Sequence, residues 1–185
     1  MSANGTHFTG PVFSTKGIKG RAATTGAGAG ITGGTGTVTA TEITKVGKVI
    51  NTQIFIDVTG LQSSTTDLDI IGQSTTPAYL AAILNSEMGQ IYAVTMTCLE
   101  APLTGVTDID LYSATAGTGA FDDGIAALVE TALVTSGAAW TLNKTATATG
   151  WPGDTEFLYL TCGAAGTVGT YTAGKFVIEL WGYEA

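Results

Sequence analysis

Charged residues are scarce in this chain, and basic ones are the scarcest. Only 12% of the 185 residues are charged, with seven Lys and Arg against fifteen Asp and Glu, which gives a net charge of −8. An average soluble domain has about 25% charged residues. An acidic surface repels phosphate backbones, so we expect no nucleic-acid partner.

Long hydrophobic runs are also missing. No stretch reaches the eighteen apolar residues that a membrane helix needs, and the opening MSANGTHFTGPVF has no apolar signal region. We therefore expect neither a membrane partner nor a secretion signal. The only two cysteines, Cys98 and Cys162, do not form a CxxC motif. We expect two buried reduced thiols, and a disulfide stays open if their strands are neighbours.

Motifs of enzyme chemistry are lacking as well. The chain has no HExxH, nucleophile elbow or phosphate loop, and its one histidine, His7, has no identifiable triad partners. Gly28, Gly30 and Gly33 match GxGxxG, but no hydrophobic strand precedes them and no helical pattern follows. We expect no enzymatic activity, no catalytic residue, no cofactor and no metal site.

What the chain does have is an uneven charge distribution. Residues 1–48 contain one acid, Glu42, and carry a net charge of +4, whereas residues 49–185 carry −12. The first segment is rich in Gly and Thr and too poor in apolar residues to offset the entropy of ordering it. We predict an extended arm over residues 1–48 and a folded domain over residues 49–185. The five basic residues of this arm are the candidate partner-binding residues: Lys16, Lys19, Arg21, Lys45 and Lys48.

Alternating apolar and polar residues predict a strand-rich domain. In residues 50–58 the even positions are Ile, Thr or Val and the odd positions are mostly polar, with Phe55 as the exception. In the closing segment, positions 176, 178 and 180 are apolar and share one face, opposite Val177, Glu179 and Trp181. We expect strands at residues 50–58, 67–71, 91–99 (ending at Ala101-Pro102), 108–112, around Trp140, 157–162 and 175–183. Their regular spacing and Gly-rich breaks predict an all-β sandwich or barrel.

Two segments have helical features. Thr76-Pro77 resembles an N-cap followed by proline, which predicts a short helix through AYLAAILNSEM. Residues 122–134 start with acids and a glycine and end with β-branched residues, so we expect a short helix that runs into a strand.

Acidic and aromatic residues give further candidates for function. Asp67 and Asp69, like Asp108 and Asp110, alternate with apolar residues, which predicts that they lie on the solvent face of a strand; a weak divalent site at a subunit boundary stays open. The adjacent pair at residues 122–123 follows a glycine-rich turn. Aromatic residues cluster in the last third of the chain, where most are expected to build the core. The candidates for an oligomer interface or a glycan contact are Trp151, Trp181 and Tyr183.

Four segments resemble small virion proteins of tailed bacteriophages, especially marine ones. They are QIFIDVTGLQSSTTDLDIIG, CLEAPLTGVTDIDLYSATAGTG, ETALVTSGAAWT and YLTCGAAGTVGTYTAGKFVIELWGY, which together span most of residues 50–183. The resemblance implies a capsid decoration or cement protein with a jelly-roll-like body, forming homotrimers on the phage head surface after synthesis in the host cytoplasm. Its implied partners are major capsid subunits and further copies of the chain. The long Gly/Thr arm equally suits a binding module of a tail, collar or fibre, lectin-like or receptor-binding.

Overall fold

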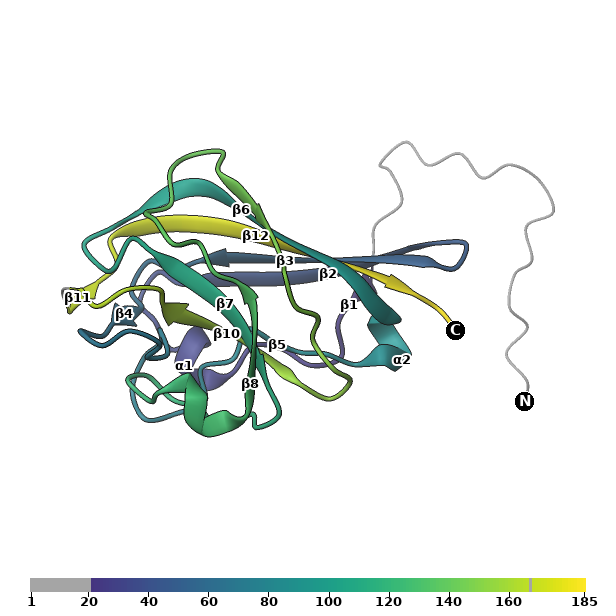
Figure 1. The fold of residues 1–185 in the computed structure, drawn as a ribbon, viewed down its shortest axis with the longest axis horizontal. Coiled ribbons are helices and arrows are strands. Elements are labelled where there is room, and N and C mark those ends of the chain that lie inside the picture. Colours follow the sequence, from purple (N-terminus) through teal and green to yellow (C-terminus); the bar gives the residue numbers. More distant parts are fainter. Residues whose placement is uncertain (1–20, 167) are drawn as a thin grey trace.

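The chain folds into a sandwich of two antiparallel β-sheets (Figure 1). The computed structural model describes residues 21–166 and 168–185. The larger sheet has the strand order β1-β2-β3-β12-β6-β9 and the smaller has the order β5-β10-β7-β8; β4 and β11 form a separate pair. The expected all-β sandwich is therefore confirmed.

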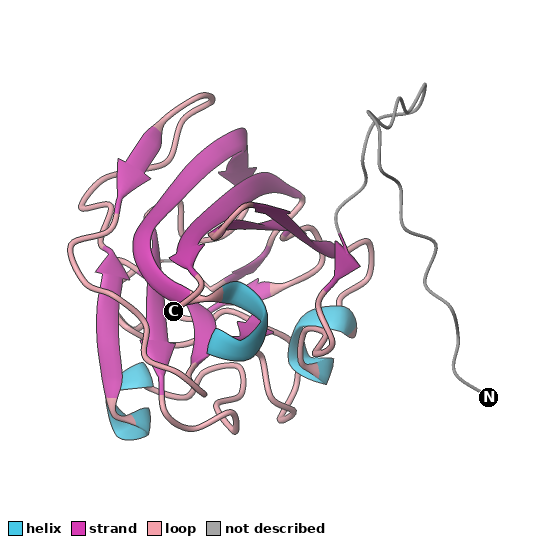
Figure 2. Ribbon diagram, turned by 90° about the vertical axis from the view of Figure 1, so that its right-hand side faces the viewer, coloured by secondary structure: helices cyan, strands magenta, loops and turns pink. Residues whose placement is uncertain are grey.

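Strands make up most of the regular structure, and the helical segments have four residues each (Figure 2). The bounds of the elements in chain order are β1 Arg21–Ala22, α1 Ala29–Thr32, β2 Val38–Val46, β3 Val49–Asp57, β4 Gln62–Ser63, β5 Ala81–Ala82, α2 Asn85–Met88, β6 Gln90–Leu103, β7 Ile109–Ala114, the 3₁₀ helix η1 Ile125–Leu128, β8 Glu130–Val134, β9 Thr145–Thr147, β10 Phe157–Cys162, β11 Gly169–Thr170 and β12 Ala173–Tyr183.

The core lies between the two sheets. Even-numbered residues of β3 and β12, including Ile54, Phe176 and Ile178, are buried on the inner face of the larger sheet. Trp140 packs edge-on against Phe176, with ring centroids 5.5 Å apart, and its indole N–H donates to the Ile109 carbonyl at 2.7 Å. Trp140 belongs to no strand. The strand expected around it is wrong, because the ring fills the core from a loop.

The expected arm is wrong over residues 21–48, which belong to the sandwich. β2 pairs with β3 along its whole length, from Val38–Asp57 to Val46–Val49. The two-residue turn between them has Gly47 at its first position with φ +62°, as type II′ hairpins require. Residues 1–20, with Lys16 and Lys19, lie outside the described residues. The sandwich therefore begins no later than residue 21.

Glycines allow the segment around α1 to pack closely against the backbone of residues 76–79. The Gly30 amide donates to the Pro77 carbonyl at 2.7 Å, and a Cβ at Gly30 would lie 2.3 Å from the Thr76 carbonyl oxygen. Gly28 meets Pro77 in the same way. These glycines therefore serve close backbone packing, which agrees with the interpretation that the GxGxxG match is fortuitous.

The helix expected after Thr76-Pro77 is mostly wrong. Residues 78–83 are extended, and the Leu80 and Ile83 amides donate to the carbonyls of Leu158 and Glu156, both at 2.7 Å. Only the single turn of α2 is helical. Burial on both sides decides the conformation here, since Leu80 and Ile83 are almost fully buried.

Of the remaining expectations about strands and helices, some are confirmed and others are wrong. β10 has the expected bounds, and η1 followed by β8 confirms the short helix that runs into a strand. β6 does not stop at Ala101-Pro102 but continues to Leu103, because Pro102 lies where the pairing with β12 is irregular and a missing N–H is tolerated. Residues 67–71 contribute isolated bridges rather than a strand.

Candidate functional site

The outer face of the larger sheet is the side turned away from the smaller sheet, and it is the candidate site. Along β3 and β12, odd-numbered residues point to this face and are exposed or half-buried, while even-numbered residues are buried. Phe55, Val177 and Trp181 therefore reach the surface of a sheet whose opposite face forms the core. Apolar side chains that stay accessible on such a face can contact a partner.

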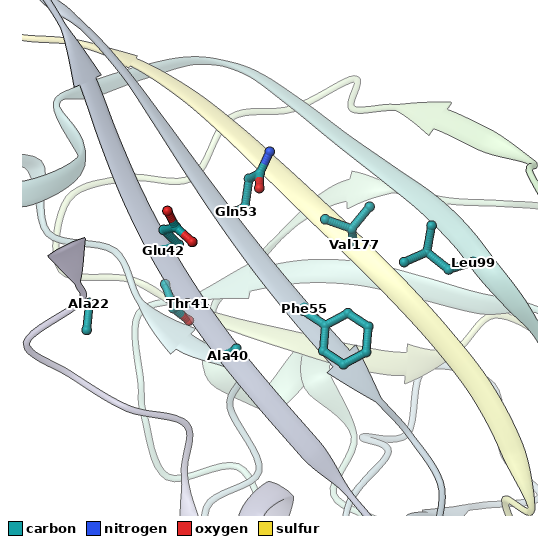
Figure 3. A pocket seen from close by; sticks show the side chains of 8 residues that line it. All are labelled: Ala22, Ala40, Thr41, Glu42, Gln53, Phe55, Leu99 and Val177. Atoms are coloured by element: carbon teal, nitrogen blue, oxygen red, sulfur yellow. The ribbon is translucent and has the colours of Figure 1, made fainter. Parts of the chain in front are cut away.

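A shallow depression of about 490 Å³, the Phe55 concavity, occupies the middle of this face. Strand pairing places Ala40, Phe55 and Val177 in one row across β2, β3 and β12. Leu99 of β6 lies outside this row, since Val177 pairs with Thr97, but its side chain also lines the concavity (Figure 3). The residues lining the concavity are Ala22, Ala40, Thr41, Glu42, Gln53, Phe55, Leu99 and Val177.

Polar and charged side chains flank the Phe55 concavity on both sides. On one side the Gln53 Nε2 donates to the Glu179 carboxylate at 3.0 Å. On the other, Lys175 lies 3.7 Å from the Asp57 carboxylate and also binds Glu100. The hydrogen bond that Lys175 donates to Glu100, together with the charges of both acids, raises the pKa of Lys175 above its ordinary value. The acids outnumber the lysine, so the rim favours a cationic partner.

A second depression of about 330 Å³, the Trp181 concavity, lies beside the first and shares Gln53 with it. Strand pairing places Thr44, Asn51 and Trp181 in one row across β2, β3 and β12. The residues lining it are Thr44, Val46, Val49, Asn51, Gln53 and Trp181.

The structure disperses the basic residues that were expected on one arm. Arg21 lies 3.2 Å from the Glu87 carboxylate, Lys45 pairs with Glu184, and the Lys48 ammonium lies over the Tyr183 ring at 5.4 Å from its centroid. These three side chains contact the chain's own body, so an extended basic arm that includes them is wrong. Whether they also meet a partner stays a prediction.

Glu87 fixes the start of the described chain. Its carboxylate, almost fully buried, accepts hydrogen bonds from the Thr24 hydroxyl, from the Thr24 amide at 3.1 Å and from Arg21. These hydrogen bonds, with Thr24 first, hold the pKa of Glu87 below its ordinary value. Residues 21–24 are thereby attached to α2.

The three candidate aromatic residues do not form one site. Trp181 and Tyr183 share the outer face and are 36% and 47% exposed. Trp151 is 50% exposed but lies in the loop before β10 and lines neither concavity.

The solvent face expected for the acidic pairs is wrong for one residue of each pair, whereas Asp67 is exposed and Asp108 is half-buried. Asp69 and Asp110 are buried; Asp69 accepts a hydrogen bond from Ser64 at 2.7 Å, and Asp110 accepts one from the Ser136 amide at 2.7 Å. Burial is the main cause that raises the pKa of Asp110. Within residues 21–166 and 168–185, no group of three or more His, Cys, Asp or Glu side chains could hold a metal ion. Cys98 and Cys162 are buried and free, as expected.

Sequence reasoning missed most residues of the Phe55 concavity. The signal that could have found it is the break in alternation at Phe55, together with Val177 and Leu99 on otherwise exposed positions. Its arrangement of apolar floor and polar rim suits noncovalent binding of another chain.

No family model, no curated protein and no solved structure matches this chain. Among the described residues, no helix is both long enough and apolar enough to cross a membrane.

Proposed function

We propose that the chain is a structural protein of a tailed-bacteriophage virion, a decoration or cement protein that binds major capsid subunits on the head surface. It acts by association rather than by catalysis. The observation that carries the proposal is the Phe55 concavity, an apolar depression on the free face of a rigid sheet.

The chemistry of the concavity defines the partner segment. Phe55, Leu99 and Val177 offer an apolar floor for one inserted side chain, which is how interface anchors bind. Glu42 lines the depression, and Glu179 lies in the adjoining row. A capsid segment with an apolar residue next to Lys or Arg therefore complements it.

The edge of the larger sheet supports a second mode of contact. β1 pairs only with Glu42 and Ile43, so within the described chain no strand lies along the rest of the outer edge of β2. An extended capsid segment could add to this edge through backbone hydrogen bonds.

The strand order supports the jelly-roll-like body that the resemblance implies. The orders β3-β12-β6-β9 and β5-β10-β7-β8 place successive strands in alternating sheets, and among these eight only the β7–β8 connection stays within one sheet. Double-sheet jelly rolls of eight strands are found in viral capsid proteins. In this proposal three copies assemble, and residues 1–20 with Lys16 and Lys19 add contacts with neighbouring subunits. Three-fold assembly would multiply individually weak contacts.

The test is co-sedimentation with phage heads assembled without this protein. A charge placed in the apolar floor by F55D should weaken binding to heads at least tenfold, because an apolar side chain inserted there would have to displace the water around the carboxylate. The matched control is V129D, which places the same charge at a residue that is 71% exposed and precedes β8 of the smaller sheet.

Circular dichroism and thermal melting must show that both variants keep the fold. If F55D binds heads as tightly as the wild type does, or if V129D loses as much binding as F55D does, the proposed site is wrong. Failure of the wild-type protein to bind heads at all would contradict the proposed function itself.

A further inference from the structure

The Trp181 concavity has a different chemistry from its neighbour. Its six lining residues are uncharged, and they combine one aromatic ring, two valines, two amides and a hydroxyl. A charged ligand finds no counter-ion among them, and a purely apolar ligand would leave the Gln53 amide without water. The lining therefore matches a neutral ligand that has one apolar face and several hydroxyl groups.

The polar groups around Trp181 still have hydrogen-bonding capacity. Asn51 is half-buried and lines the concavity, but its Nδ2 is inaccessible to water, so the accessible amide here is that of Gln53. The Gln53 amide donates to Glu179, and its carbonyl oxygen can accept a hydrogen bond from a ligand hydroxyl.

The aromatic ring is placed for stacking. Trp181 is 36% exposed and stands directly beside Asn51 in the strand pairing. Tyr183, the next aromatic residue on this face, already has the Lys48 ammonium over its ring. Trp181 is therefore the better platform for the C–H face of a ligand.

From this arrangement we propose that the Trp181 concavity is a glycan-binding site that takes a neutral pyranose ring. The ring stacks on Trp181, and its hydroxyls hydrogen-bond to Thr44 and Gln53. The inference does not rest on capsid binding, which uses the neighbouring concavity. It adds a recognition activity to a protein that otherwise acts in assembly.

The size of the depression fits this ligand. Its volume of about 330 Å³ lies at the lower end of the range for small-molecule sites, roughly 300–1,000 Å³. One sugar ring with part of a second therefore fills it. A single open site with few hydrogen bonds predicts a Kd of about 1 mM.

The experiment titrates the full chain with four neutral oligosaccharide probes, built from glucose, galactose, mannose or N-acetylglucosamine, while tryptophan fluorescence and ligand NMR are recorded. We expect at least one probe to bind. W181A should weaken that binding at least tenfold, and Q53A, on the neighbouring strand, should weaken it severalfold. The matched control W151A removes another exposed tryptophan outside the concavity and should bind like the wild type.

Three results would overturn the proposal. They are the absence of binding to all four probes, unchanged binding by W181A, and an equal loss in W151A. Because Q53A alters a different strand, it tests the site independently should W181A fail to fold.

Discussion

The two sheets of this sandwich differ in how many of their faces are covered. In β3 and β12 of the larger sheet, burial alternates residue by residue, and one face stays open. In the smaller sheet every residue of β7 is buried, and so is every residue of β10 except Phe157. A sheet covered on both faces can only support the fold, whereas the open face of the other sheet is available for recognition.

The largest expected difference in stability is between two adjacent residues of β12, one on each face of the larger sheet. Phe176 is fully buried against Trp140, whereas Val177 lies in the Phe55 concavity. F176A should reduce the free energy of unfolding by about 3–5 kcal/mol, since it leaves a cavity in the core. V177A should reduce it by less than about 1 kcal/mol, because that side chain is only partly buried.

Chemical denaturation of the two variants measures both values. Similar losses in F176A and V177A would mean that the outer face is packed as tightly as the inner one. The division into a structural face and a free face would then be wrong.

The next largest loss of stability is expected when the hydrogen bonds between Glu87 and residues 21–24 are weakened. E87Q keeps the size of the side chain but removes the charge that accepts hydrogen bonds from Thr24 and Arg21. At pH 7 it should reduce the free energy of unfolding by about 1–2 kcal/mol.

The stabilisation that Glu87 provides should depend on pH. Because the pKa of folded Glu87 is lowered from 4.5, its contribution is complete above that pH and is lost as the pH falls through the folded value. The difference between wild type and E87Q should therefore shrink on acidification. A difference that stays constant from pH 7 to pH 3 would contradict the role of the charge.

Asp110 in the smaller sheet should show the opposite and smallest effect. Burial raises its pKa above 3.8, so the charged form destabilises the fold, and this cost appears as the pH rises through the folded value. D110N can still accept the hydrogen bond from the Ser136 amide. It should raise the melting temperature at pH 7 by about 2 °C.

Calorimetry of D110N from pH 7 to below pH 4 checks this, and the gain should vanish at the acidic end. A variant that melts lower than the wild type at pH 7 would show that the charge of Asp110 stabilises the covered sheet instead.

The same difference between the sheets explains what the sequence could predict. On the larger sheet, alternation assigns the buried and exposed positions of residues 50–58 and 175–183 correctly, because one face meets water. The apolar run of β10 is also long and β-rich enough to be found.

Alternation fails where both faces are covered. Asp110 follows the pattern of an exposed residue, yet loops and neighbouring acids enclose it. Residues 78–83 have helical propensity, but hydrogen bonds to Glu156 and Leu158 keep them extended. Local propensity contains no information about such partners, which are about 75 residues away in the chain.

The site was predictable in part for the same reason. Trp181 and Tyr183 were identified because aromatic residues at exposed positions of a strand are conspicuous. The Phe55 concavity combines single residues from β2, β3, β6 and β12, so it depends on a strand order that one sequence does not specify. Glycine and threonine content misled the assignment of residues 21–48, because pairing with β3 compensates for their weak local preferences.

Cryo-electron microscopy of the protein on intact phage heads tests the central claim most directly. The account predicts that the outer face of the larger sheet is turned toward a capsid subunit, with Phe55, Leu99 and Val177 covered by an inserted apolar side chain. A reconstruction in which this face points to solvent, and the contact is made by the smaller sheet instead, would contradict it.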